Sequence, residues 1–215
     1  MTAPRILPAG DRALLLELPE RLAPAALTDR LRADALPGIA DLLPAARTVL
    51  VTLTPDAVYA KVTDRLEHVL AEFAERDAAS ADPGAAPLEI PVRYDGDDLA
   101  ETAALLGISV DELITRHTDH LWQCAFIGFA PGFGYLTSPD ADLTVPRRDR
   151  SRTKVPAGSV ALAGGYSAVY PRSSPGGWRI IGRTDTVLWD LDRPEPATLR
   201  PGASVRFVRV EGGSA

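Results

Sequence analysis

The sequence has a single cysteine, a single methionine, only two lysines and no apolar run of 18 residues. With one cysteine, Cys124, no internal disulfide can form, and this is typical of proteins kept in a reducing compartment. The first ten residues lack the apolar segment of a secretion signal, and no stretch is long and apolar enough to cross a bilayer as a helix. We therefore expect a cytoplasmic protein with no membrane partner.

Basic charge is scarce overall, since the chain of 215 residues has a formal net charge of −6 at pH 7. This balance argues against general binding of nucleic acid. Hydrophobic residues make up 46% of the chain and charged residues 24%, which is typical of a globular protein with enough apolar residues for a core. The length suits one large domain or two small ones.

The region 126–184 departs from this average, because it holds about half of the 17 glycines and an excess of positive charge. Its basic residues are Arg147, Arg148, Arg150, Arg152, Lys154, Arg172, Arg179 and Arg183, and Asp149 is the one acidic residue between 146 and 183. Glycine is common where a backbone turns tightly or approaches a ligand closely. The region therefore indicates a site for an anionic ligand. The alternative is that these arginines cover exposed strand faces and edges.

Helix and strand patterns alternate over the first 76 residues. They predict strands at 12–18, 39–43 and 48–53, a helix from Pro24 that ends before Pro37, and a second helix capped by Thr54 with an apolar stripe that begins at Val58. The order β-α-β-β-α is typical of a ferredoxin-like domain. We place this domain at 1–80 and a small, polar, proline-bearing linker at 81–87.

The pattern changes in residues 88–215, which we predict to be a second domain. A strand at 88–92 is followed by two short helices, the second opened by the capping box of Ser109 and Glu112. Apolar stretches separated by turn residues then predict strands at 122–129, 155–163, 166–170, 178–182, 186–191 and 203–210. Many short strands favour a closed β-barrel, because closure removes exposed sheet edges. The fold class is therefore α+β.

A dense set of residues resembles the allophanate hydrolase subunit 1 family, which includes the B-type subunit of 5-oxoprolinase and the kinase inhibitor KipI. The matching residues are Gly128-Phe129, Pro131-Gly132-Phe133, Tyr135-Leu136, Pro146-Arg147-Arg148, Arg152, Val155 to Val160, Tyr170-Pro171, Pro175 to Trp178 and Ile181 to Thr184. Weaker likenesses extend from Gly10 to Phe207 and include His117. The resemblance thus covers almost the whole chain.

This resemblance implies an N-terminal ferredoxin-like domain followed by a C-terminal cyclophilin-like β-barrel. It also implies a hetero-oligomeric, ATP-dependent 5-oxoprolinase that opens 5-oxo-L-proline to L-glutamate, with this chain as its B-type subunit. The implied partners are a second cyclophilin-like subunit and a third component. No GxxxxGK[ST] loop or GxGxxG fingerprint is present, so we expect ATP with Mg²⁺ to bind to the assembled complex in a non-standard site.

Two other functions remain open within the resemblance. One is a carboxyltransferase-type component acting on urea or another amide, which would need a biotin carrier and a carboxylase. The chain lacks the Met-Lys context of biotinylation, its one methionine being Met1. The other is a KipI-type inhibitor of a sensor histidine kinase. Arginines that line a pocket would favour the enzyme, and an exposed apolar patch would favour the inhibitor.

Three arginines are the first candidates for chemistry, because opening a lactam needs donors where negative charge develops. We expect Arg148 to be catalytic and Arg147 and Arg152 to bind substrate, since guanidinium groups grip carboxylate or phosphate. The alternative is a salt-bridged surface loop. His117 is a second catalytic candidate, as a general acid or base near neutral pH, although a histidine at a helix end is commonly a structural partner.

Aromatic residues and glycine are the candidates for the pocket wall. We expect Gly132, Phe133 and Tyr135 to bind substrate, with a β-bulge and core aromatics as the alternative. Tyr166 joins them because the family commonly has Gly-x-Gln-Thr-Gly where this chain has Tyr166-Ser167-Ala168. His117 and His120 lack a third ligand at suitable spacing, so we expect no metal.

Overall fold

The computed structural model describes residues 3–19, 22–75 and 86–211. The chain divides into two compact units, 1–83 and 84–215. Most of the predicted linker 81–87 lies outside the described residues, so its bounds stay a prediction. Among the described helices, none is both long enough and apolar enough to span a bilayer.

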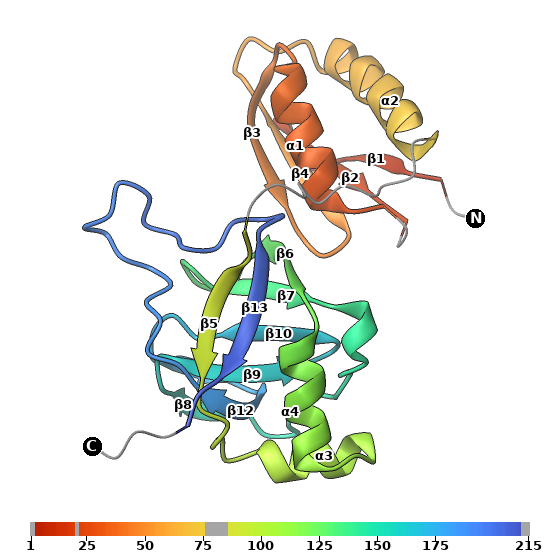
Figure 1. Ribbon diagram of the computed structural model, residues 1–215. Helices are drawn as coiled ribbons and strands as arrows, with labels where there is room; N and C mark the ends of the chain where they lie inside the picture. The colour runs from red at the N-terminus through yellow and green to blue at the C-terminus, as the bar shows by residue number, and fades with distance from the viewer. Residues whose placement is uncertain (1–2, 20–21, 76–85, 212–215) are drawn as a thin grey trace. The chain divides into compact units, whose positions relative to one another are not determined.

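The first unit contains a four-stranded antiparallel sheet and two helices (Figure 1). Its elements are β1 (Arg5–Pro8), β2 (Ala13–Glu17), α1 (Pro24–Asp34), β3 (Ile39–Pro44), β4 (Thr48–Leu53) and α2 (Tyr59–Glu75). The sheet order is β1-β2-β4-β3. The predicted order β-α-β-β-α is present from β2 to α2, and the sequence analysis missed β1, which pairs with β2.

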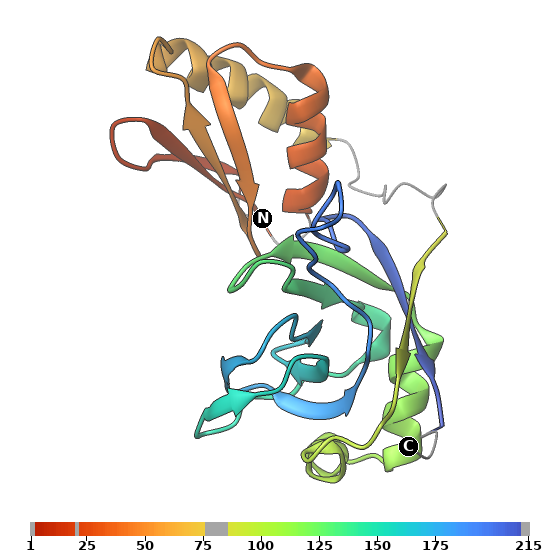
Figure 2. The same ribbon diagram turned by 90° about the vertical axis from the view of Figure 1, so that its left-hand side faces the viewer.

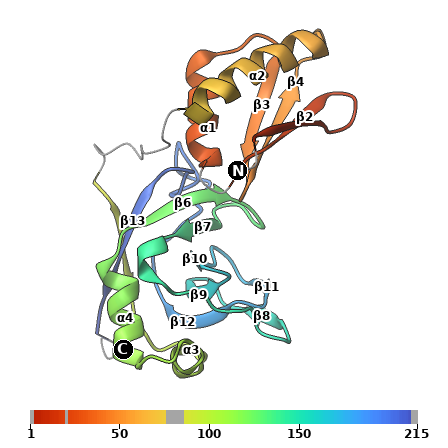
Figure 3. The same cartoon turned by 90° about the vertical axis from the view of Figure 1, so that its right-hand side faces the viewer.

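Alternation of apolar residues explains why one face of this sheet is buried. Leu14 and Leu16 in β2 and Val49 and Val51 in β4 are at most 1% exposed, and residues two apart on a strand point to the same side. They form one core with apolar residues of α1 and α2. Figure 3 shows both helices on the same side of the sheet.

The predicted start of α2 is wrong, because the helix begins at Tyr59 and not after Thr54. The Thr54 amide donates to the Gly38 carbonyl at 3.0 Å, and the Thr54 carbonyl accepts from the Ala57 amide at 3.1 Å. These bonds close a turn that delays the helix. Val58 therefore precedes the helix and is 55% exposed.

The second unit is built on a seven-stranded sheet of order β12-β9-β10-β7-β6-β13-β5. Its elements are β5 (Leu88–Val92), α3 (Leu99–Leu106), α4 (Val110–Asp119), β6 (Trp122–Ile127), β7 (Gly134–Thr137), the 3₁₀ turn η1 (Pro139–Ala141), β8 (Arg152–Val155), β9 (Ser159–Ala163), β10 (Tyr166–Val169), β11 (Ser174–Gly176), β12 (Arg179–Arg183) and β13 (Ser204–Arg209). Strands β8 and β11 form a separate two-stranded sheet. The unit is thus mixed α/β with a barrel-like sheet, whose curl is visible in Figure 2.

Two predicted strands differ from the structure. The stretch 155–163 is divided into β8 and β9 by a turn at Pro156 to Gly158. The stretch 186–191 forms no strand and contributes only an isolated bridge between Trp189 and Ala197. Its apolar residues suggested a strand, but only Leu188 is buried, while Val187 and Leu191 are 51% and 76% exposed.

Backbone hydrogen bonds nearly close the sheet on itself. Arg93, just after β5, and Arg183 in β12 exchange two bonds of 2.9 Å, and the Asp98 amide donates to the Ile180 carbonyl at 2.9 Å. This approach requires glycine at two points. A Cβ on Gly96 would lie 2.3 Å from the Ile180 carbonyl oxygen, and one on Gly182 would lie 2.4 Å from that of Arg93.

The two faces of the sheet carry different apolar clusters. Val160 and Leu162 of β9 belong to a cluster that includes Leu113 of α4, while Ala161 and Ala163 of the same strand belong to a cluster of aromatic residues. The alternation follows from the two-residue period of a strand. The aromatic face holds the pocket described below.

We predict that Gly182→Ala destabilises the second unit, because the added methyl group must displace the Arg93 carbonyl that closes the sheet. Overpacking of this kind lowers the free energy of unfolding by about 1–3 kcal/mol, and chemical denaturation would measure it. Gly128→Ala is the matched control, since the nearest atom to its added Cβ lies 3.5 Å away. Equal stability of the two variants would contradict the account of closure.

Candidate functional site

A pocket of about 240 Å³ lies on the aromatic face of the second unit. It is lined by Phe129, Phe133, Tyr135, Arg147, Ser151, Tyr170, Pro175, Gly176, Gly177 and Trp178. The ring of Phe133 packs at 84° to that of Tyr170 and at 90° to that of Trp178, with centroids 5.2 and 5.5 Å apart. Edge-to-face contacts of this kind hold aromatic rings in fixed positions. These packed rings form one wall of the pocket.

Glycine in the lining permits this packing. A Cβ on Gly176 would lie 2.2 Å from the Tyr170 hydroxyl oxygen, so β11 can lie against that ring only as bare backbone. Gly132 has a φ of +77° and would place a Cβ 2.9 Å from that of Trp189. It is a buried residue of the turn between β6 and β7 and is not part of the lining.

Arg147 supplies the positive charge of the lining. Its side chain is exposed, and within residues 3–19, 22–75 and 86–211 it forms no hydrogen bond or ion pair. A guanidinium group with free donors beside an aromatic wall can bind a carboxylate or phosphate through two parallel hydrogen bonds. The structure thus brings together Arg147, Phe133 and Tyr135 of the predicted site residues.

Arg148 and Arg152 are instead held by a buried carboxylate, that of Asp98, which is 2% exposed. Arg152 donates to both of its oxygens at 2.8 and 2.9 Å, and Arg148 donates to Oδ1. The Ile180 amide donates to Oδ2 at 2.7 Å. The two arginines thus satisfy an internal charge, as in the salt-bridged alternative, although Arg148 lies next to Arg147 in the loop and Arg152 begins β8 just after it.

Hydrogen bonding keeps Asp98 ionised against the effect of burial. Burial alone would raise the pKa of this carboxyl, but the hydrogen bonds from Arg152 and Ile180 and the charges of both arginines outweigh it and lower the pKa. The bond to Asp98 in turn raises the pKa of Arg152. A second pair adjoins the cluster, because Arg179 contacts Glu101 at 3.0 Å and donates to the Pro146 carbonyl at 3.0 Å.

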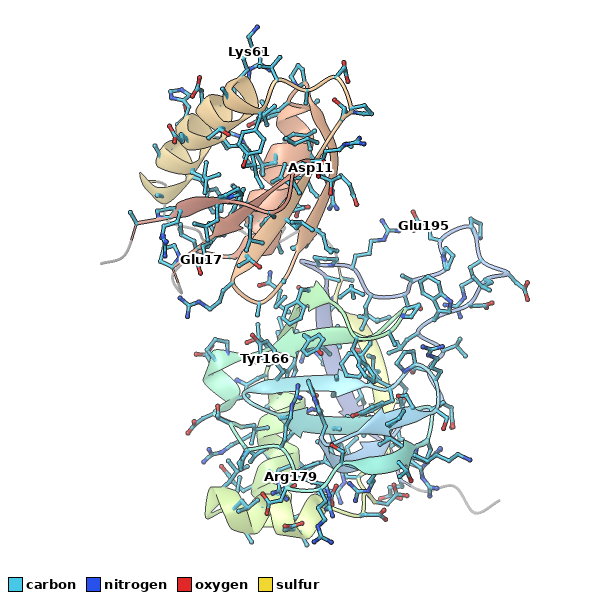
Figure 4. The ribbon with its side chains drawn as sticks, turned by 180° about the vertical axis from the view of Figure 1, so that it is seen from behind. Asp11, Glu17, Lys61, Tyr166, Arg179 and Glu195 are labelled. Atoms are coloured by element: carbon cyan, nitrogen blue, oxygen red, sulfur yellow. The ribbon has the colours of Figure 1, made fainter. Side chains whose placement is uncertain are left out.

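Tyr166 lies in β10, and Figure 4 shows it apart from Arg179. Its ring packs edge-on against Phe126 and Tyr135, with centroids 5.8 and 5.7 Å away. Burial raises the pKa of its hydroxyl. Tyr166 therefore supports the pocket through Tyr135 and does not line it.

His117 lies in the other cluster, on the opposite face of β10. It is fully buried, and its ring stacks on Phe207 with centroids 4.1 Å apart. Nδ1 lies 2.7 Å from the Tyr94 hydroxyl oxygen and Nε2 lies 2.8 Å from that of Ser167. Hydroxyl groups both donate and accept, so either neutral tautomer is satisfied. Burial lowers the pKa of His117 to about 3.

Three residues of this region, Asp98, Phe129 and Trp178, were not predicted as site residues from the sequence. Phe129 and Trp178 both belong to the motifs that match the family, so their place in those motifs could have suggested that they line the pocket. Asp98 ends the acidic run that follows Tyr94, and nothing in that run marks it as the one that is buried. Within the described ranges, no three His, Cys, Asp or Glu side chains gather as a metal site would require.

The class of protein follows from a family comparison. The family described as "Carboxyltransferase domain, subdomain C and D" matches residues 4–199. That match covers most of the chain and includes the whole pocket. The chain therefore belongs to this family.

Among curated relatives, the chain is 38% identical to a protein of Escherichia coli O157:H7 that is named as the B-type subunit of 5-oxoprolinase, over 95% of both chains. It is 33% identical to the protein of the same name from Bacillus subtilis (strain 168), over 94% of this chain and 90% of the relative. The similarity extends over nearly the full length of each relative.

Solved structures show the same fold. The crystal structure of TTHA0988 matches with a TM-score of 0.74 and 33% identity over 95% of this chain, which spans only 41% of that longer chain. The K. lactis urea amidolyase matches with a TM-score of 0.72 over 96% of this chain and 15% of its own, at 18% identity. This second likeness concerns the fold alone.

We predict that the neutral state of His117 makes stability depend on pH. Its pKa is lowered from 6.5 to about 3 on folding, so between these values the unfolded chain binds more protons. The free energy of unfolding should therefore rise by up to about 1.4 kcal/mol per pH unit from pH 4.5 to 6.5. Chemical denaturation across this range measures the slope.

His117→Gln should flatten that slope, whereas His68→Gln should keep it, because the His68 side chain is 79% exposed. If His117→Gln fails to fold, NMR titration of the wild-type ring decides the matter. An imidazole signal of His117 that titrates near pH 6.5 would contradict the prediction.

We also predict that Asp98→Asn removes about 3 kcal/mol of stability at pH 7, because Arg148 and Arg152 lose their one buried counter-charge and keep only the exposed Glu101 and Asp97 nearby. The lowered pKa means that the contribution of Asp98 is present above its ordinary value of 3.8 and is lost as pH falls through the folded value. The variant should lose this acid sensitivity.

Asp97→Asn is the matched control for this prediction. Its side chain is 83% exposed and lies 3.9 Å from Arg152, so its removal should change stability little. Denaturation of both variants at pH 7 and pH 3 tests the difference. A loss in Asp97→Asn as large as that in Asp98→Asn would refute the central role of Asp98.

Proposed function

We propose that this chain is the B-type subunit of a hetero-oligomeric, ATP-dependent 5-oxoprolinase, which opens 5-oxo-L-proline to L-glutamate. The observation that carries the proposal is the pocket, where the free guanidinium of Arg147 stands beside an aromatic wall. The names of the relatives from E. coli and B. subtilis support it.

The proposed substrate suits this pocket chemically. 5-Oxoproline is a small ring that carries one carboxylate and one lactam carbonyl. Arg147 would pair with the carboxylate, and Phe133 and Tyr135 would pack against the apolar ring atoms. A volume of about 240 Å³ has room for a ring of this size. Gly132 would contribute by shaping the turn that carries the wall.

Arg148, Arg152 and His117 take supporting roles in this proposal. The two arginines would hold the loop of Arg147 in place through Asp98. His117 would keep β10 and α4 in register through Ser167, with Tyr166 bracing Tyr135 from the other face of β10. We predicted Arg148 and His117 as catalytic residues from the sequence. We now propose that they position other groups, because Arg148 is hydrogen-bonded to Asp98 and His117 to Ser167.

The remaining chemistry belongs to the assembly. Hydrolysis of ATP would supply the driving force for opening the lactam. The chain has no standard phosphate-binding loop, so we assign ATP with Mg²⁺ to the assembled complex and derive no step through it. The partners would be a second cyclophilin-like subunit and a third component, in a cytoplasmic location that the single cysteine favours.

We further propose that the first unit is a ferredoxin-like domain and the second a cyclophilin-like barrel. In the first unit, α1 connects β2 to β3, and β4 lies between these two strands in the sheet. This is the arrangement of a split βαβ unit. In the second, closure at Arg93 and Arg183 supports a barrel. Val187, Trp189 and Leu191, which are 36% to 76% exposed, are available for contact with a partner subunit.

A carboxyltransferase-type component acting on urea or another amide is the second candidate. It is favoured by 34% identity to the urea amidolyase of Saccharomyces cerevisiae over 91 residues, although these cover only 39% of this chain. A KipI-type kinase inhibitor would use the exposed apolar residues of 187–191 instead. Binding of a histidine kinase without turnover of small molecules would distinguish it.

The test is to co-express the chain with its two partners and measure ATP-dependent release of glutamate from 5-oxoproline, with the chain present and omitted. We predict that release depends on the chain. Arg147→Ala should raise the KM about 10- to 100-fold, since a hydrogen bond to a charged group contributes about 1.5–3 kcal/mol, and Arg147→Lys should recover part of the loss.

Arg150→Ala is the matched control, because it removes an exposed arginine of the same loop that is outside the pocket lining. Its KM should stay at the wild-type value. A complex that assembles but releases no glutamate would overturn the 5-oxoprolinase proposal. Normal turnover in Arg147→Ala would remove Arg147 from the substrate site.

A further inference from the structure

Phe129 has an unusual backbone conformation for a bulky residue. Its φ is +66°, in the left-handed region that side chains with a Cβ rarely adopt. The Ala130 amide donates to the Gly128 carbonyl at 2.7 Å, which closes a three-residue γ-turn with Phe129 at its centre. A γ-turn with positive φ is rare and strained.

The usual explanation of positive φ does not apply here. Among the described residues, the other non-glycine residues with positive φ are Ala35 and Asp142. Each caps the end of a helical segment, α1 and η1 respectively, where left-handed residues are regular. Phe129 follows no helix, so its conformation has no such structural cause.

Burial does not explain Phe129 either, because the residue is 59% exposed. Three other rings of the lining, those of Phe133, Tyr170 and Trp178, are at most 5% exposed. The Phe129 ring is steeply inclined to two of them, at 73° to Phe133 and 80° to Tyr170, with centroids 5.2 and 6.4 Å apart. Phe129 thus exposes an aromatic side chain to solvent at the pocket, although its backbone conformation is unfavourable for a residue with a Cβ.

The surrounding turn holds the strained residue in place. The Gly128 amide donates to the Phe133 carbonyl at 3.1 Å, and the Phe133 amide donates to the Ala130 carbonyl at 3.0 Å. Strain that neighbouring structure maintains is concentrated at ligand clamps and active sites. A side chain presented in this way is available to a ligand without a rearrangement of the turn.

We propose that Phe129 is a specificity-determining residue, whose ring covers a small, flat, carboxylate-bearing ring held by Arg147. The ligand would fill the pocket between the buried rings and Phe129 and remove exposed apolar surface of Phe129 from water. This inference rests on the proposed function and deepens it. The Phe129 ring would favour binding of cyclic carboxylates over open-chain ones. Acyclic acids would leave part of the Phe129 face in water.

The test uses Phe129→Gly, Phe129→Leu and the control Ala35→Gly in the assembled complex. Binding of 5-oxoproline, proline and the acyclic N-acetylglycine is measured by calorimetry, and thermal stability is recorded in parallel. We expect Phe129→Gly to weaken binding of both ring carboxylates at least 5-fold without lowering the melting temperature, because glycine relieves the strain. Binding of N-acetylglycine, weaker in the wild type, should change less than 2-fold.

The two further variants separate strain from recognition. Ala35→Gly relieves a positive φ far along the sequence, in the first unit, and should leave all binding unchanged. Phe129→Leu keeps the strain and loses the flat ring, so it should weaken ring binding to an intermediate degree. If Phe129→Gly fails to assemble, the result for Phe129→Leu decides.

Unchanged binding in both Phe129 variants overturns the inference, and so does a fall in melting temperature that accompanies weaker binding of all three probes. Failure of the wild-type complex to bind either ring carboxylate also overturns it. The proposed function is judged separately by glutamate release. A complex that binds ring carboxylates through Phe129 but releases no glutamate would retain the inference and refute the 5-oxoprolinase.

Discussion

The pairing of Asp98 with Ile180 is the contact on which the second unit most depends. The Asp98 amide donates to the Ile180 carbonyl, and the Ile180 amide donates back to the Asp98 carboxylate at 2.7 Å. This pair lies where the segment after β5 meets β12, so it joins the two ends of the seven-stranded sheet. The same carboxylate holds Arg148 and Arg152. The buried carboxylate of Asp98 thus contributes both to closure of the sheet and to the position of the segment that contains Arg148 and Arg152.

A buried carboxylate requires this many donors, because removal of its hydration is costly unless polar partners replace the water. That requirement changes the meaning of the basic region. Arg148 and Arg152 neutralise Asp98, and Arg179 pairs with Glu101. Arg147 is left beside the pocket with free donors. Adjacent arginines of the basic region thus differ in environment, because Arg148 and Arg152 are bound to Asp98 while Arg147 lines the pocket.

Several features could be read directly from the sequence because their causes are local. The strand β4 was predicted with its observed bounds from its short apolar Val-Leu-Val run, and its residues alternate between buried and half-buried. The capping box at Ser109 was also correct, and the Ser109 hydroxyl accepts from the Glu112 amide at 3.1 Å. Strand β1 was missed because it is stabilised by pairing with β2. The stretch 186–191 has a strand-like pattern but no extended partner.

The sequence by itself determined the order of most elements, the apolar faces of strands and helices, and the motifs that place the chain in its family. Only the tertiary structure decided which polar groups act together. Asp98 meets Arg148 and Arg152 across 50 and 54 positions, and His117 meets Ser167 across 50. Propensity and periodicity act over a few residues, whereas ion pairing and desolvation depend on groups that folding brings together. For that reason Arg147 and Arg148, adjacent in the chain, have different environments.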